Sequence, residues 1–474
     1  MLERITRNDK ILHWTMVGLG ALITANYTLT GNIILLAPFL LLGLWWWTRF
    51  AVKHPAAALV VVIFFAEHCF DMFTFGLRQR FLSDLAILLM LLLIALNLRK
   101  VWHHLSIQRT PYPLSILLFF FALLISLYWG SHLTFGQPMG IGLTVARKHL
   151  LFLSYFFLAA TGATREDCFL FLKYLAWLGA GIAFLSLVEV LLGGGVIFSH
   201  YYAVGQERAG LLRIHVGTFL VVFSLIYSLV KLQYTPSGTR QRLFYTILIG
   251  INLFTLIFVV ITRAVILGLL VTLLLWLIRK ISNKKIIFIC STVSLFATII
   301  LTGLGETMVS ETFIGEILGQ TTTEMSSDTG NISIRKKGAQ FYLKLIQDTA
   351  PLTGIGIFSF TNYPNNPVTM AADRFSYYLV DTNGITTLVY FGLQGLLLLI
   401  FFVYKSLKDA NRLMKNNEDP LKYNYEILFY VFIYILVTPT LGNIIVERML
   451  IYSGMFFYLL SSSAKNYVIV RKAI

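Results

Sequence analysis

The chain has 474 residues, of which 57% are hydrophobic and only 13% charged, and its net charge is +16. A soluble protein of this length would lack the polar side chains to cover its core, so the composition excludes a soluble globular fold. Continuous apolar runs predict transmembrane helices, because the strands of a membrane barrel alternate over about ten residues. The basic residues fall in short connections between these runs, which indicates membrane orientation and not nucleic-acid binding.

We predict an all-α polytopic membrane protein with about 12–14 transmembrane helices. The candidate segments in chain order are 11–29, 31–48, 55–75, 82–98, 113–130, 145–162, 168–192, 212–230, 243–261, 264–279, 285–304, 384–404, 425–442 and 448–463. The only long polar insert, residues 305–383, separates the eleventh segment from the twelfth. The chain therefore divides into an N-terminal helical part (1–304), the insert (305–383), and three C-terminal helices with a tail (384–474).

The distribution of Lys and Arg orients these helices. If the N-terminus is cytoplasmic, the same side collects most of the 38 basic residues, including Arg49, Arg99 and the cluster at 279–285. Cytoplasmic loops carry this excess in membrane proteins. The sequence therefore predicts a multi-pass protein with both termini in the cytoplasm and the insert on the outer side, which is the periplasm of a Gram-negative bacterium.

Basic residues on the predicted outer side are the minority that orientation does not explain. Four isolated arginines lie there, at or near helix ends: Arg147, Arg213, Arg263 and Arg335. Arginine forks bind phosphate oxygens, and several of them together fit a pyrophosphate, so we predict a lipid-pyrophosphate ligand. Arg208 and Lys336 are secondary candidates.

Each of these arginines has an alternative interpretation. A single arginine at a helix end snorkels to the membrane interface or pairs with a carboxylate, for which Glu189, Glu207 and Glu447 are candidates. For one arginine taken alone the two interpretations are about equally supported, whereas four on one side favour a binding site.

The insert contains a predicted amphipathic helix that begins near Arg335 and is stopped by Pro351. One face of this helix carries Ala339, Tyr342, Leu343 and Ile346. Gly354 and Gly356 then allow a tight turn, although a Gly-x-Gly pattern without a preceding strand does not establish phosphate binding.

Aromatic and polar residues follow this turn. The aromatic residues are Phe358, Phe360, Tyr363, Phe375, Tyr377 and Tyr378, which either stack on sugars or bury the insert; burial is favoured for any single residue. Asp381 is the candidate general base, with Asn383 beside it, although both are also good helix N-caps. His215 is a further acid–base candidate, and no spacing indicates a metal site.

Several short patterns occur together between about 210 and 400. Arg213 is followed by Ile-His-Val-Gly-Thr, and Arg263 is flanked by Thr262 and Ala264. Arg335-x3-Ala339 precedes Asp-Thr-Ala-Pro-Leu-Thr-Gly-Ile-Gly at 348–356, and Asn383 precedes Phe-Gly-Leu-Gln-Gly at 391–395. In these residues the chain resembles the O-antigen ligase/polymerase family of bacterial membrane glycosyltransferases.

The resemblance implies a GT-C-like helical fold in the bacterial inner membrane, with the insert as a periplasmic catalytic loop. It implies transfer of glycan from undecaprenyl pyrophosphate without metal or other cofactor, and a partner that regulates chain length. Pyrophosphate binding falls to Arg213, Arg263 and Arg335, with Arg147 as a weaker match, and catalysis to Asp381 with Arg335 and Arg263.

One position departs from the family pattern. Ligases of the family usually carry His immediately before the Asn that corresponds to Asn383. This chain has Thr382 at that position, preceded by Asp381. We therefore expect a polymerase of O-antigen or exopolysaccharide repeat units, with a ligase as the alternative. A lipid-linked glycan flippase or transporter is a third interpretation, supported only by the cluster Glu67, His68 and Asp71.

Overall fold

The computed structural model describes residues 37–66, 81–107, 110–198, 217–260, 263–280, 331–379, 385–415, 421–437 and 449–473, together with 207–208, 211–212, 214 and 419. The candidate segments 11–29 and 285–304 lie outside this part of the chain. Within it the fold is helical, apart from one two-residue ladder in which β1 (Glu207–Arg208) pairs antiparallel with β2 (Leu211–Leu212). An all-α polytopic membrane protein is thus confirmed at this level.

Helices account for most of the described residues. In chain order they are α2 (Ala37–Lys53), α3 (Pro55–Ala66), α5 (Phe81–Leu96), α6 (Leu98–Ile107), α7 (Tyr112–Ile125), η3 (Ser126–Thr134), α8 (Met139–Ala146), η4 (Arg147–Leu153), α9 (Ser154–Thr161), α10 (Arg165–Leu191), α12 (Thr218–Tyr234), α13 (Arg240–Phe254), η5 (Thr255–Val260), α14 (Arg263–Lys280), α18 (Asn331–Thr349), α19 (Pro367–Phe375), α20 (Thr386–Met414), α21 (Lys422–Val437) and α22 (Met449–Ala473). Thr164 is the N-cap of the 27-residue helix α10 and forms a capping box with Asp167.

Among the described residues, five helices are long and apolar enough to cross a membrane. They are Tyr112–Thr134, Met139–Thr161, Arg165–Leu191, Arg240–Val260 and Thr386–Met414. A sixth results if Ser83–Leu96 and Leu98–Ser106 form one span, although the two are bent by 74°. The larger number of 12–14 spans stays a prediction.

The predicted start of the segment 145–162 is wrong. The helix expected to begin at 145 begins at Met139, directly after Pro138, which is well suited to a helix start. Arg147 therefore lies inside an apolar helical stretch and does not open it.

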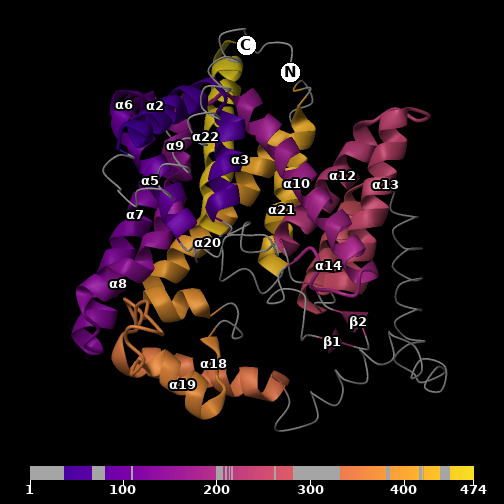
Figure 1. Ribbon diagram of the computed structural model, residues 1–474. Helices are drawn as coiled ribbons and strands as arrows, with labels where there is room; N and C mark the ends of the chain where they lie inside the picture. Colours follow the sequence, from indigo (N-terminus) through magenta and orange to yellow (C-terminus); the bar gives the residue numbers. More distant parts are fainter. Residues whose placement is uncertain are drawn as a thin grey trace, which may run out of the picture.

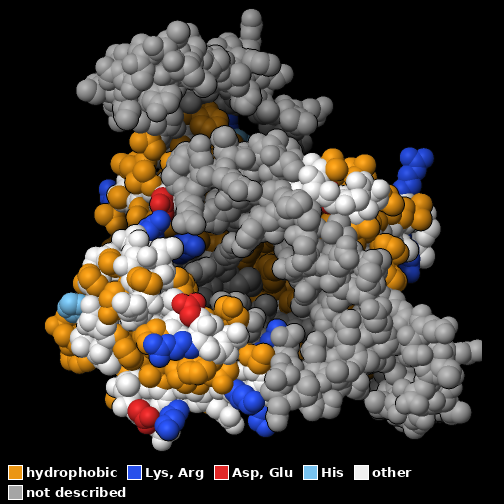
Figure 2. Space-filling view, turned by 60° about the horizontal axis from the view of Figure 1, so that its bottom comes forward, with side chains coloured by type: hydrophobic (Ala, Val, Ile, Leu, Met, Phe, Trp, Pro, Cys, Tyr) orange, Lys and Arg blue, Asp and Glu red, His pale blue; other side chains and the backbone are white. Residues whose placement is uncertain are grey.

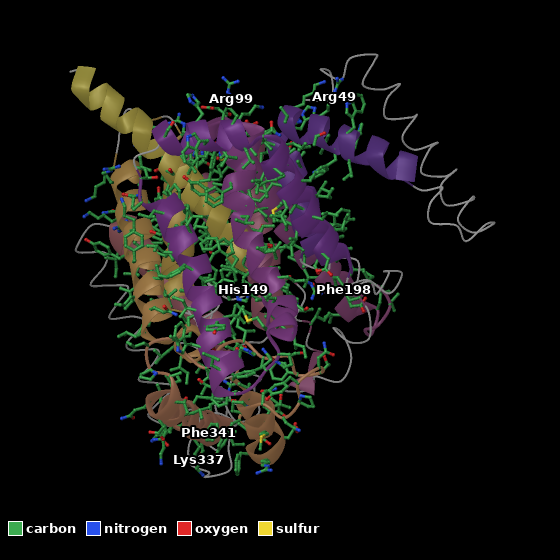
Figure 3. All side chains as sticks on the ribbon, turned by 90° about the vertical axis from the view of Figure 1, so that its left-hand side faces the viewer. Arg49, Arg99, His149, Phe198, Lys337 and Phe341 are labelled. Carbon is green, nitrogen blue, oxygen red and sulfur yellow. The ribbon has the colours of Figure 1, made fainter. Side chains whose placement is uncertain are left out.

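The helices form a bundle with two distinct ends (Figure 1). α2 and α6 lie at one end, and α18 and α19 lie across the other. Figure 3 shows the same division for single residues, with Arg49 and Arg99 at the first end and Lys337 at the second. Arg49 and Arg99, which the orientation rule places on one side of the membrane, thus lie at the same end of the bundle.

The two ends differ in their cores. The main hydrophobic core runs through the bundle helices, whereas a second, smaller core lies beneath α18 and α19. Its buried members are Tyr342, Ile346, Ile355, Phe358, Val368, Ala371, Leu379 and Val389. We call residues 331–379, which supply all of these except Val389, the polar module. Because Val389 belongs to α20, the module packs directly onto the bundle.

Candidate functional site

The amphipathic helix predicted in the insert is present as α18, and it ends before Pro351 as expected. Tyr342 and Ile346 are buried, whereas Leu343 is 41% exposed, so its assignment to the apolar face is wrong. One residue corresponds to 100° of rotation around a helix, which turns Leu343 onto the flank beside Tyr342. Burial raises the pKa of Tyr342, whose hydroxyl donates to the carbonyl oxygen of Tyr377 at 2.8 Å.

Burial of the aromatic residues is confirmed for only part of the set. Phe358 is buried, and Tyr363 and Tyr377 are half-buried. Phe360, Phe375 and Tyr378 are each more than half exposed. The ring of Phe375 stacks on that of Tyr377, with centroids 5.4 Å apart.

The surface of the polar module is mainly basic. Its exposed charged side chains on α18 and α19 are Arg335, Lys336, Lys337, Lys344, Asp348, Asp373 and Arg374. Figure 2 shows Lys and Arg side chains spread over this face of the molecule, with fewer acidic ones. Two predicted site residues, Arg335 and Lys336, thus lie together on α18. An anionic ligand would meet a favourable potential here.

Four glycines fasten the module to the bundle by contact of backbone against backbone. They are Gly130 in η3, Gly354 and Gly356 in the turn after α18, and Gly392 in α20, and we call this cluster the glycine contact. A Cβ at Gly354 would come within 2.5 Å of the backbone nitrogen of Gly392, and one at Gly130 within 2.5 Å of the carbonyl oxygen of Gly354. No side chain other than hydrogen fits these positions.

Gly392 has a second role in this contact. Its φ of 64° and ψ of −158° interrupt α20 six residues after the helix begins. The interruption exposes backbone groups that the turn can pair with, as broken membrane helices require. The N–H of Ile355 donates to Val389 O at 2.8 Å, and that of Leu393 to Pro351 O at 3.0 Å.

The Gly-x-Gly turn is therefore a docking element. The N–H of Gly354 donates to Ala350 O at 2.9 Å, and that of Gly356 to Tyr390 O at 3.2 Å. Because the amide of Ile355 between them also has a partner, all three consecutive N–H groups are engaged within the protein. The turn leaves none of these amides to bind a phosphate, which agrees with the caution drawn from the sequence.

Side chains from the η3–α8 connection support the same turn. The amide of Gln137, which is 1% exposed, donates to Ile357 O at 2.9 Å and accepts from Ser359 N at 3.0 Å. Ser126 donates to the carbonyl oxygen of Tyr390, close to the same contact. Sequence reasoning missed Gln137, because a lone glutamine between two apolar segments carries no distinguishing pattern.

A second group of predicted residues lies where α13 ends and α14 begins. Arg263 is the first residue of α14, which starts at the module end of the bundle (Figure 1). The N–H of Ile214 donates to Val259 O at 3.1 Å, which fixes residue 214 beside the end of η5. Arg208 belongs to β1, and β1 pairs with β2, which packs on η5. Backbone that carries Arg208 and Arg263 thus meets at one corner.

Arg147 has a carboxylate partner. Its Nε lies 2.5 Å from Asp84 Oδ1, and its NH2 group donates to Asp84 Oδ2 at 3.1 Å. This two-point ion pair joins η4 to the first turn of α5 and is the geometry that an arginine fork favours. The ion-pair interpretation therefore describes Arg147, with Asp84 as the partner in place of the glutamates considered from the sequence.

The carboxylate of Glu189 binds backbone N–H groups. Glu189 is fully buried, and its carboxylate accepts from Val196 N at 3.0 Å and Ile197 N at 2.7 Å, which closes the loop after α10.

Four predicted site residues lie outside the described part of the chain: Arg213, His215, Asp381 and Asn383. Their roles stay predictions. Within the described residues, no group of three His, Cys, Asp or Glu side chains could hold a metal ion.

Comparison of the chain with protein-family models found no match, and comparison with curated proteins found none either.

Proposed function

We propose that this chain is an integral-membrane glycosyltransferase that polymerises lipid-linked glycan repeat units. It transfers a growing glycan from one undecaprenyl pyrophosphate to the non-reducing sugar of a second lipid-linked unit. The reaction takes place outside the inner membrane, between the polar module and the end of the bundle on which it is docked.

The observation that carries this proposal is a basic module fixed to the end of a membrane bundle. Arg335 precedes the buried Tyr342 by seven residues and Ile346 by eleven, so the three lie on one side of α18. Lys344 lies on the opposite side. Arg335 is thus the basic residue of α18 closest to the buried side of that helix, and Arg263 begins a helix at the same end of the bundle.

These positions suit the chemistry of a pyrophosphate leaving group. Departure of the lipid pyrophosphate is assisted when fixed positive charges neutralise the oxygens that gain charge in the transition state. Arg335 and Arg263 would supply two such charges, with Arg213 as a third. Asp381 would take the proton from the acceptor hydroxyl. A helix-borne arginine on a docked module is pre-organised for this task.

Purified protein in liposomes with lipid-linked repeat units tests the proposal. The wild type is expected to form polymer without an ion gradient, and Arg335→Ala and Arg263→Ala to lower the rate by at least ~10²-fold, the size typical of one lost transition-state donor. Lys344→Gln removes a charge from the far side of α18 and should retain the activity. Normal polymer from both alanine variants would disprove the assignment.

The same proposal separates polymerase from ligase in cells. A strain without this protein should attach single repeat units to the acceptor if a polymerase is lost, and no glycan if a ligase is lost. Transport driven by an ion gradient without polymer formation would favour the transporter interpretation.

A further inference from the structure

At the end of the bundle opposite the polar module, α6 packs on α9 beside the end of α5. α5 and α6 are bent by 74° relative to each other, and the bend falls at Asn97. The side chain of Asn97 donates back to Leu93 O at 3.1 Å, which ends α5 there. α5 packs along α3 and α9 of the bundle, so a helix bent by 74° from α5 runs across the end of the bundle. Figure 3 shows α6 in this orientation, with Arg99 pointing away from the bundle.

The surface of α6 is divided into three arcs. Val101 is buried against the bundle, and the ring of His104 stacks on that of Tyr458 with centroids 5.0 Å apart. Leu98 and Trp102 are 61% and 76% exposed and lie one helical turn apart on one flank of this buried arc.

The third arc is polar. Arg99 and His103 are exposed on the side of α6 that faces away from the bundle, and Lys100 is exposed on the flank opposite Leu98 and Trp102. A helix with a bundle-facing arc, an apolar flank and a basic outer side matches the pattern of an interfacial helix, with large apolar rings on one side and Lys or Arg on the other.

α5, which precedes α6, also exposes large apolar side chains. Leu88, Leu91 and Leu96 on α5 are 56%, 37% and 63% exposed, and α6 follows α5 after a single residue. A neighbouring helix repeats the combination of ring and charge, because the guanidinium of Arg49 lies 4.3 Å from the ring centroid of Trp45. Amphipathic rings and basic groups at the ends of membrane helices mark the headgroup level.

We propose that α6 is an anchor for anionic phospholipid, with Trp102 and Leu98 inserted at the boundary of headgroups and acyl chains and Arg99 and Lys100 on lipid phosphates. The charge of the helix is complementary to an anionic leaflet and not to another basic protein surface such as a second copy of this chain. This anchor fixes the depth of the bundle at the end remote from the polar module. It does not depend on the glycosyltransferase assignment.

Nitroxide labels at two adjacent positions test the anchor. Trp102→Cys and His103→Cys, each in the full chain with Cys69, Cys168 and Cys290 replaced by alanine, are labelled in nanodiscs of phosphatidylcholine and phosphatidylglycerol. The label at 102 is expected to collide with oxygen, which dissolves in the acyl region, several-fold more than with a water-soluble nickel complex. The label at 103 is the matched control and should show the reverse preference. Both side chains are exposed, so neither substitution disturbs packing.

The lipid charge is tested by the same label. In phosphatidylcholine alone, or with Arg99→Gln and Lys100→Gln in the mixed lipid, the oxygen preference at 102 should fall towards that at 103. A label at 102 that is shielded from both collision partners would show that protein covers α6, either residues 1–36 or a second copy, and would overturn the proposal. Preference for the nickel complex at 102, or equal behaviour in both lipids, would overturn it as well.

Discussion

The two ends of the bundle are fastened by opposite means. At the module end, turns of backbone meet directly through the glycine contact. Near the other end of α20, side chains meet instead: Lys405 Nζ lies 2.7 Å from Asp409 Oδ2, to which the Tyr112 hydroxyl also donates at 3.0 Å. A backbone contact excludes every added carbon, whereas a side-chain cluster loses strength one group at a time. The backbone contact therefore holds the module at one fixed distance from the bundle, whereas the side-chain cluster can lose one interaction and keep the others.

Gly356→Ala should produce the largest effect. At a φ of 84°, an alanine is strained by about 1–2 kcal/mol. Its Cβ would also come within 2.8 Å of Ser126 O, and overpacking adds about 1–3 kcal/mol. We expect a loss of about 3 kcal/mol or more in the free energy of unfolding, measured by thermal unfolding in detergent, and faster tryptic cleavage at Arg335 and Lys336.

Gly250→Ala is the matched control for this substitution. Gly250 lies in α13, and an added Cβ would have no neighbour within 4 Å. Alanine in a helix interior is better than glycine by roughly 0.5–1 kcal/mol, so this variant should be neutral or slightly stabilised. Equal unfolding temperatures for the two variants would contradict the role of the glycine contact.

Asp409→Asn tests the Lys405–Asp409 pair and should cause the next largest loss in the free energy of unfolding. Asp409 is 2% exposed, and its loss leaves the Lys405 ammonium without its counter-charge. Breaking a buried pair costs about 3–5 kcal/mol, and partial exposure of Lys405 reduces this to about 2–3 kcal/mol.

A double-mutant cycle distinguishes pairing from packing. Lys405→Gln combined with Asp409→Asn should be less destabilised than the sum of the single variants, because neither charge remains alone. Lys408→Gln, an exposed neighbour on α20, is the control. Strict additivity would show that the two residues do not act as a pair.

Gln137→Met tests a side chain at the module end, where Gln137 forms hydrogen bonds to the backbone of the turn. The substitution keeps the volume but removes two buried hydrogen bonds. It leaves Ser359 N unsatisfied, and Ile357 O keeps only the longer bond from Ser131 Oγ at 3.3 Å. We expect a loss of about 2 kcal/mol. Gln347→Met, at an exposed position of α18, should stay within about 0.5 kcal/mol of the wild type. If both variants unfold at the same temperature, the two hydrogen bonds of Gln137 contribute nothing to stability.

The sequence predicts the helices and turns that depend on residues close together in the chain. Hydrophobic period and Pro351 locate α18, and Gly354 with Gly356 indicates a turn, because these signals act over a few residues. The position of Gly392 beside that turn results from packing across the bundle, and no local pattern contains it. The same holds for Asp84, which lies 63 residues from Arg147 in the chain.

Local sequence patterns likewise predict only part of the candidate site. Arg263 is the first residue of α14, as the sequence predicts from charge at the edge of an apolar run, whereas Arg335 is the fifth residue of α18, which begins four residues before the predicted start. Their common position at one end of the bundle follows from alternating helix direction. Whether they share one ligand depends on tertiary distances, which no local sequence pattern gives, and the Arg335→Ala and Arg263→Ala variants in the liposome assay address this.

Tyr342→Phe should have the smallest effect and isolates the module's own core. It removes the hydrogen bond to Tyr377 O and costs about 1 kcal/mol at neutral pH. Burial holds the Tyr342 pKa above its ordinary value, so the neutral phenol stabilises the fold fully below pH ~10, the value of the unfolded chain, and this stabilisation is lost as the pH rises further. Thermal unfolding between neutral pH and pH ~11 should therefore show a steeper alkaline decline for the wild type than for Tyr342→Phe. Tyr378→Phe, at a side chain that is 54% exposed, serves as the control and should follow the wild-type profile. Parallel profiles for wild type and Tyr342→Phe would mean that the buried phenol does not couple the module's stability to pH.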